Sequence, residues 1–164
     1  MRNKKTLILG TISIVAVFTV IIFLIMPNFI LSVVTSDINL KGENFDGIHL
    51  NQNINELEVD EITEDNLNPN FYHLSNGMRV ITDEKRFIKN IAITHNTDKT
   101  VRTSRGISIG DSLDIVKKSY GEDYYNRSEQ GVEIIVYVDN NTFIEFWHFN
   151  NEVQEIRFGY NGIN

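Results

Sequence analysis

The chain has 164 residues, a formal net charge of −7 and no cysteine. The absence of cysteine excludes a disulfide framework, thiolate metal sites, a cysteine nucleophile and a lipid-anchored cysteine. The acidic balance argues against nucleic-acid binding, because that binding depends on Lys and Arg side chains that neutralise phosphates.

The N-terminal part of the chain predicts a membrane anchor. Residues 7–26 form an apolar run without a charged residue or a proline, and about 20 apolar residues allow a helix to cross a bilayer. Arg2, Lys4 and Lys5 precede the run, so the positive-inside rule places the N-terminus in the cytoplasm and the C-terminal domain outside. The alternative is a cleaved signal peptide, whose apolar core is usually about 7–15 residues long.

This pattern divides the start of the chain into three parts. We expect a cytoplasmic basic tip over residues 1–5, a transmembrane anchor over 6–34 and a polar stalk over 35–46. The expected location is the cell membrane, crossed once.

Two later segments of the chain resemble each other. The sequence "GIHLNQNINEL" from Gly47 aligns with "GISIGDSLDIV" from Gly106, and "FIKNIAIT" from Phe87 aligns with "EVQEIRFG" from Glu152. Such self-similarity is typical of an internal repeat. We therefore expect two divergent copies of one α+β unit, over residues 47–95 and 96–164.

The second copy opens with a predicted helix. Leu113, Val116 and Tyr120 have the spacing of one helical face. Asp111 is the expected N-cap, since a carboxylate there can accept the amide hydrogens of the first turn. Gly121 suits the left-handed position after the last turn.

The glycines around this helix could instead bind a phosphate. A P-loop has Lys followed by Ser or Thr after its second glycine, whereas Gly110 is followed by Asp111 and Ser112. An acidic residue at a helix N-terminus would also repel an anion. We therefore interpret the glycines as structural.

The rest of each copy predicts strands joined by short turns. The expected strands are residues 132–138, 142–149 and 152–160 in the second copy and 70–75, 78–83 and 86–94 in the first. Asn76-Gly77 between two such runs is a strong hairpin signal. The predicted fold class is α+β: an N-terminal transmembrane helix, then two copies of a short helix plus a three-stranded antiparallel meander. The copies could stack their sheets or share one continuous sheet.

An acidic run lies between the predicted helix and strands of the first copy. It could supply oxygen ligands for calcium, but it lacks the regular aspartate spacing and glycine of a calcium loop. We expect a solvated linker. Its residues are Glu56, Glu58, Asp60, Glu61, Glu64 and Asp65.

The second copy carries a resemblance to known modules. It rests on the glycine–apolar–x–apolar–glycine entry, on the Asp-Ser start and Tyr-Gly end of the helix, and on the meander that follows. The pattern resembles small exported modules of Gram-positive bacteria. It is similar in layout to beta-lactamase inhibitory protein and to outer-membrane-assembly lipoprotein domains. The resemblance covers residues 106–160 well and 47–94 weakly, and it implies a protein-binding role. The anchor, the missing cysteine and the divergent first copy depart from it.

One aromatic-rich set is the candidate binding patch. If the two copies pack through it, the set is core; otherwise it is an exposed surface of the kind that binds a protein or glycan. Its members are Tyr124, Tyr125, Phe143, Glu145, Trp147 and Phe149.

Glu145 has two interpretations. A carboxyl among aromatic side chains can act as a general acid, but a glycosidase-like site also requires a second carboxylate across a cleft. The interpretation we favour pairs Glu145 with Arg157 on the neighbouring strand. The four histidines are isolated from one another, which predicts no metal site.

The leading functional prediction is a membrane-anchored extracytoplasmic binding module without catalytic activity or cofactor. Its expected partners are the membrane, through residues 7–26, and an envelope protein or a wall component. The alternative is a small cell-envelope hydrolase that uses Glu145 with a second carboxylate. A role of the span in assembling a membrane complex has only Gly10 and scattered hydroxyl side chains in its favour.

Overall fold

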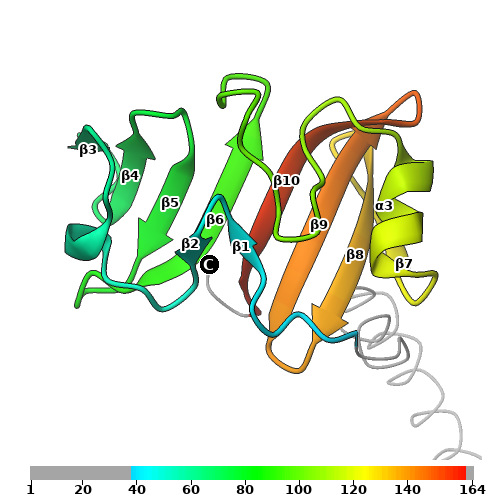
Figure 1. Cartoon of the computed structure of the whole chain (residues 1–164), viewed down its shortest axis with the longest axis horizontal. Helices are drawn as coiled ribbons and strands as arrows, with labels where there is room; N and C mark the ends of the chain where they lie inside the picture. Colours follow the sequence, from blue (N-terminus) through cyan, green and yellow to red (C-terminus); the bar gives the residue numbers. More distant parts are fainter. Residues whose placement is uncertain (1–37, 162–164) are drawn as a thin grey trace, which may run out of the picture. The chain divides into compact units, whose positions relative to one another are not determined.

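Eight strands of the described residues form one antiparallel sheet (Figure 1). The computed structural model describes residues 38–161, which lie within one unit of the chain, Thr35–Asn164. The order in the sheet is β3-β4-β5-β6-β10-β9-β8-β7. The strands are β3 (Ile62–Glu64), β4 (Phe71–Leu74), β5 (Arg79–Thr82), β6 (Ile88–Thr94), β7 (Tyr125–Glu129), β8 (Val132–Asp139), β9 (Thr142–Phe149) and β10 (Glu152–Tyr160).

The sheet consists of two four-stranded meanders that join at β6 and β10. The order of strands is symmetric about this pair, in which Ala92 lies opposite Arg157. Besides Ala92, six aliphatic and aromatic side chains of the two strands are buried, and these six are the residues that align between the two similar segments. They are Ile88, Ile91, Ile93, Val153, Ile156 and Phe158.

The main core lies between the sheet and the elements that cover one of its faces. The helix α3 (Leu113–Tyr120) buries Leu113, Val116 and Tyr120, as its spacing predicts. The ring centre of Tyr120 lies 5.0 Å from that of Phe146 in β9. The strands β1 (Asn44–Phe45) and β2 (Ile48–His49) and the 3-10 helix η1 (Ile54–Glu56) contribute further buried side chains to the same core.

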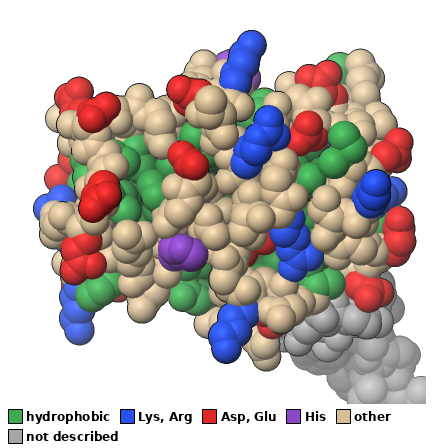
Figure 2. All heavy atoms as spheres, viewed as in Figure 1, with side chains coloured by type: hydrophobic (Ala, Val, Ile, Leu, Met, Phe, Trp, Pro, Cys, Tyr) green, Lys and Arg blue, Asp and Glu red, His purple; other side chains and the backbone are tan. Residues whose placement is uncertain are grey.

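Acidic side chains are scattered over this covered face. Figure 2 shows Asp and Glu lying between polar and hydrophobic atoms, without one large patch of a single kind. Among the described residues, this face therefore shows no concentrated patch of one charge or of apolar side chains.

Short asparagine-rich turns join the strands at the predicted places. Asn150 and Asn151 both have positive φ angles between β9 and β10, as a two-residue hairpin turn requires. Gly77 follows Asn76 between β4 and β5, and a Cβ atom on Gly77 would lie 2.4 Å from the carbonyl oxygen of Asn96. No other residue type fits at this turn without displacing the backbone of residues 96 and 97.

The predicted fold class is wrong. The structure is largely β, with one eight-stranded sheet and the small β1–β2 sheet, rather than two copies of a helix plus a three-stranded meander. The first half has only the three-residue η1 where a helix was expected, because Leu57 is extended and no apolar residue continues the helical spacing beyond it. Each half has a fourth strand, β3 or β7, that the sequence analysis missed.

Two local predictions also need correction. Ser112, not Asp111, is the N-cap of α3, and it makes no side-chain capping bond. The carboxylate of Asp111 instead accepts a hydrogen bond from the backbone amide of Ser108 at 2.8 Å. The acidic run is not only a linker, because β3 lies within it and pairs with β4.

The prediction of a membrane anchor is withdrawn, both as part of the fold class and as the basis for a location in the cell membrane. Among residues 38–161 there is no helix with the length and apolar character needed to cross a bilayer. The predicted tip and anchor, residues 1–34, lie outside the described residues.

Candidate functional site

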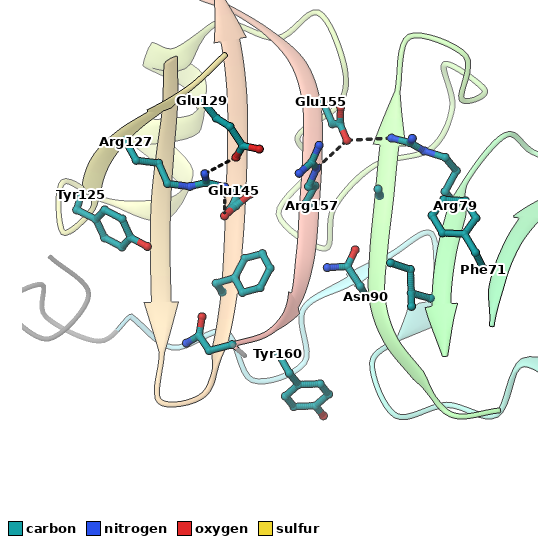
Figure 3. A pocket seen from close by; sticks show the side chains of 14 residues that line it. Phe71, Arg79, Asn90, Tyr125, Arg127, Glu129, Glu145, Glu155, Arg157 and Tyr160 are labelled. Carbon is teal, nitrogen blue, oxygen red and sulfur yellow. Dashed lines mark hydrogen bonds and ion pairs between the residues drawn. The ribbon is translucent and has the colours of Figure 1, made fainter. Parts of the chain in front are cut away.

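A groove of about 560 Å³ crosses the face of the sheet that α3 does not cover (Figure 3). Side chains from β4, β5, β6, β7, β9 and β10 line it. Polar and charged groups form most of its floor, and aromatic side chains lie toward its ends. The groove is therefore a surface that belongs to both halves of the sheet.

A register shift in each central strand decides which residues reach the groove. In β10 the pairing with β9 shifts by one residue at Gln154, so that Val153 is in the core while Glu155 and Arg157 are on the groove face. In β6 the pairing with β5 shifts at Lys89. Because side chains alternate along a strand, a one-residue shift reverses the face on which all later residues lie.

The first charged cluster joins β5 to β10 across β6. Arg79 donates from Nη2 to Oε1 of Glu155 at 2.9 Å, and Arg157 donates from Nε to the same oxygen at 2.8 Å. Ala92 of β6 is the register partner of both arginines. Because the side chain of Ala92 is small, it leaves room above β6 for the ion pair between Arg79 and Glu155.

The second charged cluster lies between β7 and β9. Arg127 donates to Oε1 of Glu145 at 2.7 Å and to Oε2 of Glu129 at 2.6 Å. The indole Nε1 of Trp147 donates to the other oxygen of Glu145 at 3.0 Å. Both carboxylate oxygens of Glu145 are thus occupied, and only 10% of its side chain is exposed.

The second cluster alters the ionisation of two groove residues, Arg127 and Tyr125. Burial opposes the charge of Arg127, but its hydrogen bonds to Glu129 and Glu145 outweigh burial and raise its pKa. Burial, followed by the negative charge of Glu145, raises the pKa of Tyr125. These groups therefore keep Arg127 charged and Tyr125 neutral around neutral pH.

Aromatic side chains surround the charged floor. Phe71 of β4 lies near one end, Tyr125 of β7 lies near the other, and Tyr160 lies at the end of β10 (Figure 3). Phe143 of β9 also lines the groove. Arg157 stacks on Trp147 with its guanidinium carbon 4.0 Å from the ring centre. Partly exposed aromatic and arginine side chains in one concavity are typical of binding sites.

The structure separates the six predicted site residues. Tyr125, Phe143 and Glu145 line the groove, and Trp147 lies beside them, covered by Arg157. Tyr124 belongs to the opposite face, where its ring packs edge-on against Tyr137 at 5.6 Å.

Phe149 is also separate from the groove. It is 65% exposed at the end of β9 and borders a different depression, next to His148 and Leu113. The structure therefore brings together four of the six residues, and they form neither a fully buried core nor a fully exposed patch.

Glu145 lies directly opposite Arg157 in the pairing of β9 with β10, as expected. Its ion pair, however, is with Arg127 of β7. Sequence reasoning missed Arg79, Arg127 and Glu155 as site residues. Strand alternation in "MRVITD" was the available signal for Arg79, whereas the short polar sequence "YNRSE" did not indicate that β7 is a strand.

Candidate metal ligands do not gather in the described part of the chain. Among residues 38–161, no three or more His, Asp or Glu side chains are close enough together to hold a metal ion.

Comparisons of the chain with protein-family models, with curated proteins and with solved structures give no significant match. The resemblance to small exported modules, stated on the sequence motif, stays a prediction.

Proposed function

We propose that this protein is a non-catalytic binding module whose partner is another protein, held in the groove on the open face of the sheet. The observation that carries this proposal is the groove itself, which is about 560 Å³ in volume and places Arg79, Arg127 and Arg157 among partly exposed aromatic side chains. Arginine and aromatic residues in a concave surface dominate the binding energy of many protein interfaces.

Two contacts favour binding over hydrolysis. A general acid has to donate a proton to the substrate from a position within hydrogen-bond reach. Glu145 instead accepts hydrogen bonds on both oxygens, from Arg127 and from Trp147. Glu129, the other carboxylate of this cluster, also accepts a hydrogen bond from Arg127. These contacts suit a rigid recognition surface.

Position-specific photo-cross-linking in cells that express the full chain tests the proposal. A photoreactive benzoylphenylalanine replaces Phe143 or Tyr125 in the groove, and a control replaces Ile115, which is 46% exposed on α3. We expect the same discrete protein adduct from both groove positions and no such adduct from position 115. Adducts that are equal at all three positions, or absent from the groove positions, would contradict the proposal.

A further inference from the structure

The two charged clusters of the groove are unequal in charge. Glu155 alone compensates Arg79 and Arg157, which leaves one excess positive charge. At the other cluster Arg127 is shared by two carboxylates, Glu129 and Glu145, which leaves one excess negative charge. The groove is therefore dipolar, although the whole chain is strongly acidic.

The positive cluster has hydrogen-bond donors to spare. Within residues 38–161, Arg157 makes a hydrogen bond only through Nε, and Arg79 only through Nη2. The Nε atom of Arg79 is buried and has no hydrogen-bond partner among these residues. Each of the two side chains is 34% exposed and lines the groove, so their donors other than the buried Nε of Arg79 can reach a ligand there.

The surroundings hold these donors in place. The guanidinium of Arg157 is stacked on Trp147, and both arginines are tied to one oxygen of Glu155. Between the two strands that carry them, Ala92 offers only a methyl group. Fixed guanidinium groups next to open space are suited to a planar carboxylate, which they can bind through charge-assisted hydrogen bonds.

We infer that the Arg79–Arg157 pair is a carboxylate-binding subsite, which takes an Asp or Glu side chain of the protein partner. This inference rests on the proposed function and adds the chemistry of recognition. The excess negative charge at Arg127, Glu129 and Glu145 then favours a basic group at the other end of the groove. Together the two clusters fix the direction in which the bound segment of the partner lies.

Small probes test the subsite without knowledge of the partner. The full chain, labelled with ¹⁵N, is titrated with glutarate and with its neutral diamide, glutaramide, while the side-chain Nε–H signals of Arg79 and Arg157 are followed. We expect saturable shifts with glutarate and none with glutaramide. Arg157→Gln should weaken glutarate binding at least about tenfold, which is the effect of losing a charge-assisted hydrogen bond.

Arg86→Gln is the matched control, because Arg86 lies outside the groove. Four outcomes would overturn the inference: equal shifts with both probes, no shift with either up to the solubility limit, equal weakening by both substitutions, or tighter binding of inorganic phosphate than of glutarate. If glutarate fails while the groove-specific photo-adduct persists, only the carboxylate subsite is wrong. If the adduct is absent as well, the proposed function fails with it.

Discussion

The guanidinium carbon of Arg157 lies 4.0 Å from the ring centre of Trp147, directly on the groove face of the sheet. Arg127 approaches the same ring at 5.3 Å. These contacts explain why Trp147 is only 8% exposed although it lies on the face that α3 does not cover. The arginines thus serve as a polar cover over an aromatic side chain as well as charged groups of the groove.

Removal of this cover should be visible in fluorescence, because Trp147 is the only tryptophan of the chain. We expect Arg157→Gln to shift the emission maximum to longer wavelength and to increase quenching by acrylamide. Loss of the cation–π contact should lower the free energy of unfolding by about 0.5–2 kcal/mol. Arg79→Gln is the control, and an equal spectral change in both variants would show that Arg157 does not shield the ring.

The two carboxylates that bind Arg127 should contribute unequally to stability. Glu145 is 10% exposed and also accepts the indole hydrogen bond, so Glu145→Gln should cost about 1.5–3 kcal/mol in the free energy of unfolding. Glu129 is 43% exposed, so Glu129→Gln should cost about 0–1 kcal/mol. Chemical denaturation measures both values, and the opposite order would refute the assignment of Glu145 as the principal partner of Arg127.

His148 should make the protein less stable in acid. Burial lowers its pKa from 6.5, Glu133 opposes that effect, and Lys117 adds to it. The unfolded chain therefore binds more protons on His148 than the folded chain does in the range between the lowered pKa and about 6.5. In that range the free energy of unfolding should rise with pH. Below that range, the full loss of stability that comes from the lowered pKa of His148 is present.

The contribution of His148 is measured as the difference between the wild type and His148→Gln in denaturant unfolding across this range. The variant should show a flatter dependence on pH, whereas His95→Gln, at an exposed position, should keep the wild-type dependence. Identical curves for the wild type and His148→Gln would contradict the prediction.

Two glycines with nearly the same backbone conformation allow a steric test. Gly77 and Gly131 have φ angles of 80° and 82°, so alanine at either position costs about 1–2 kcal/mol in backbone strain. Only at Gly77 does a new Cβ meet the backbone, 2.4 Å from the oxygen of Asn96, whereas at Gly131 nothing lies within 4 Å. Gly77→Ala should lower the melting temperature clearly more than Gly131→Ala, and equal losses would be inconsistent with the close approach.

The sequence predicted the strands that turn signals separate. Asn76-Gly77, Asn140-Asn141 and Asn150-Asn151 lie between consecutive runs of apolar residues, and strands β4, β5, β6, β8, β9 and β10 lie close to the expected ranges. The edge strand β7 could not be recognised, because its sequence "YNRSE" is mostly polar and short. For the same reason the three-residue β3 was assigned to a linker.

The site was predicted in part because alternation along one strand is readable. Along β9, Phe143 and Trp147 lie on the face opposite Ile144 and Phe146, as alternation in a strand requires. Arg79, one partner of Glu155, lies 76 residues away in sequence, and Arg127, the ion-pair partner of Glu145, lies on the unrecognised strand β7. The contact between Arg79 and Glu155 depends on cross-strand register and on the one-residue shift at Gln154, which leaves no composition signal in the chain.

The most direct test of the central claim, that a protein partner occupies the groove, is a change at its floor. Ala92→Leu adds bulk between Arg79 and Arg157 without removing a charge. Photo-cross-linking from position 143 should then lose the adduct seen in the otherwise unchanged chain, while thermal unfolding confirms that the variant folds. An undiminished adduct in folded Ala92→Leu protein would contradict the claim that the groove holds the partner.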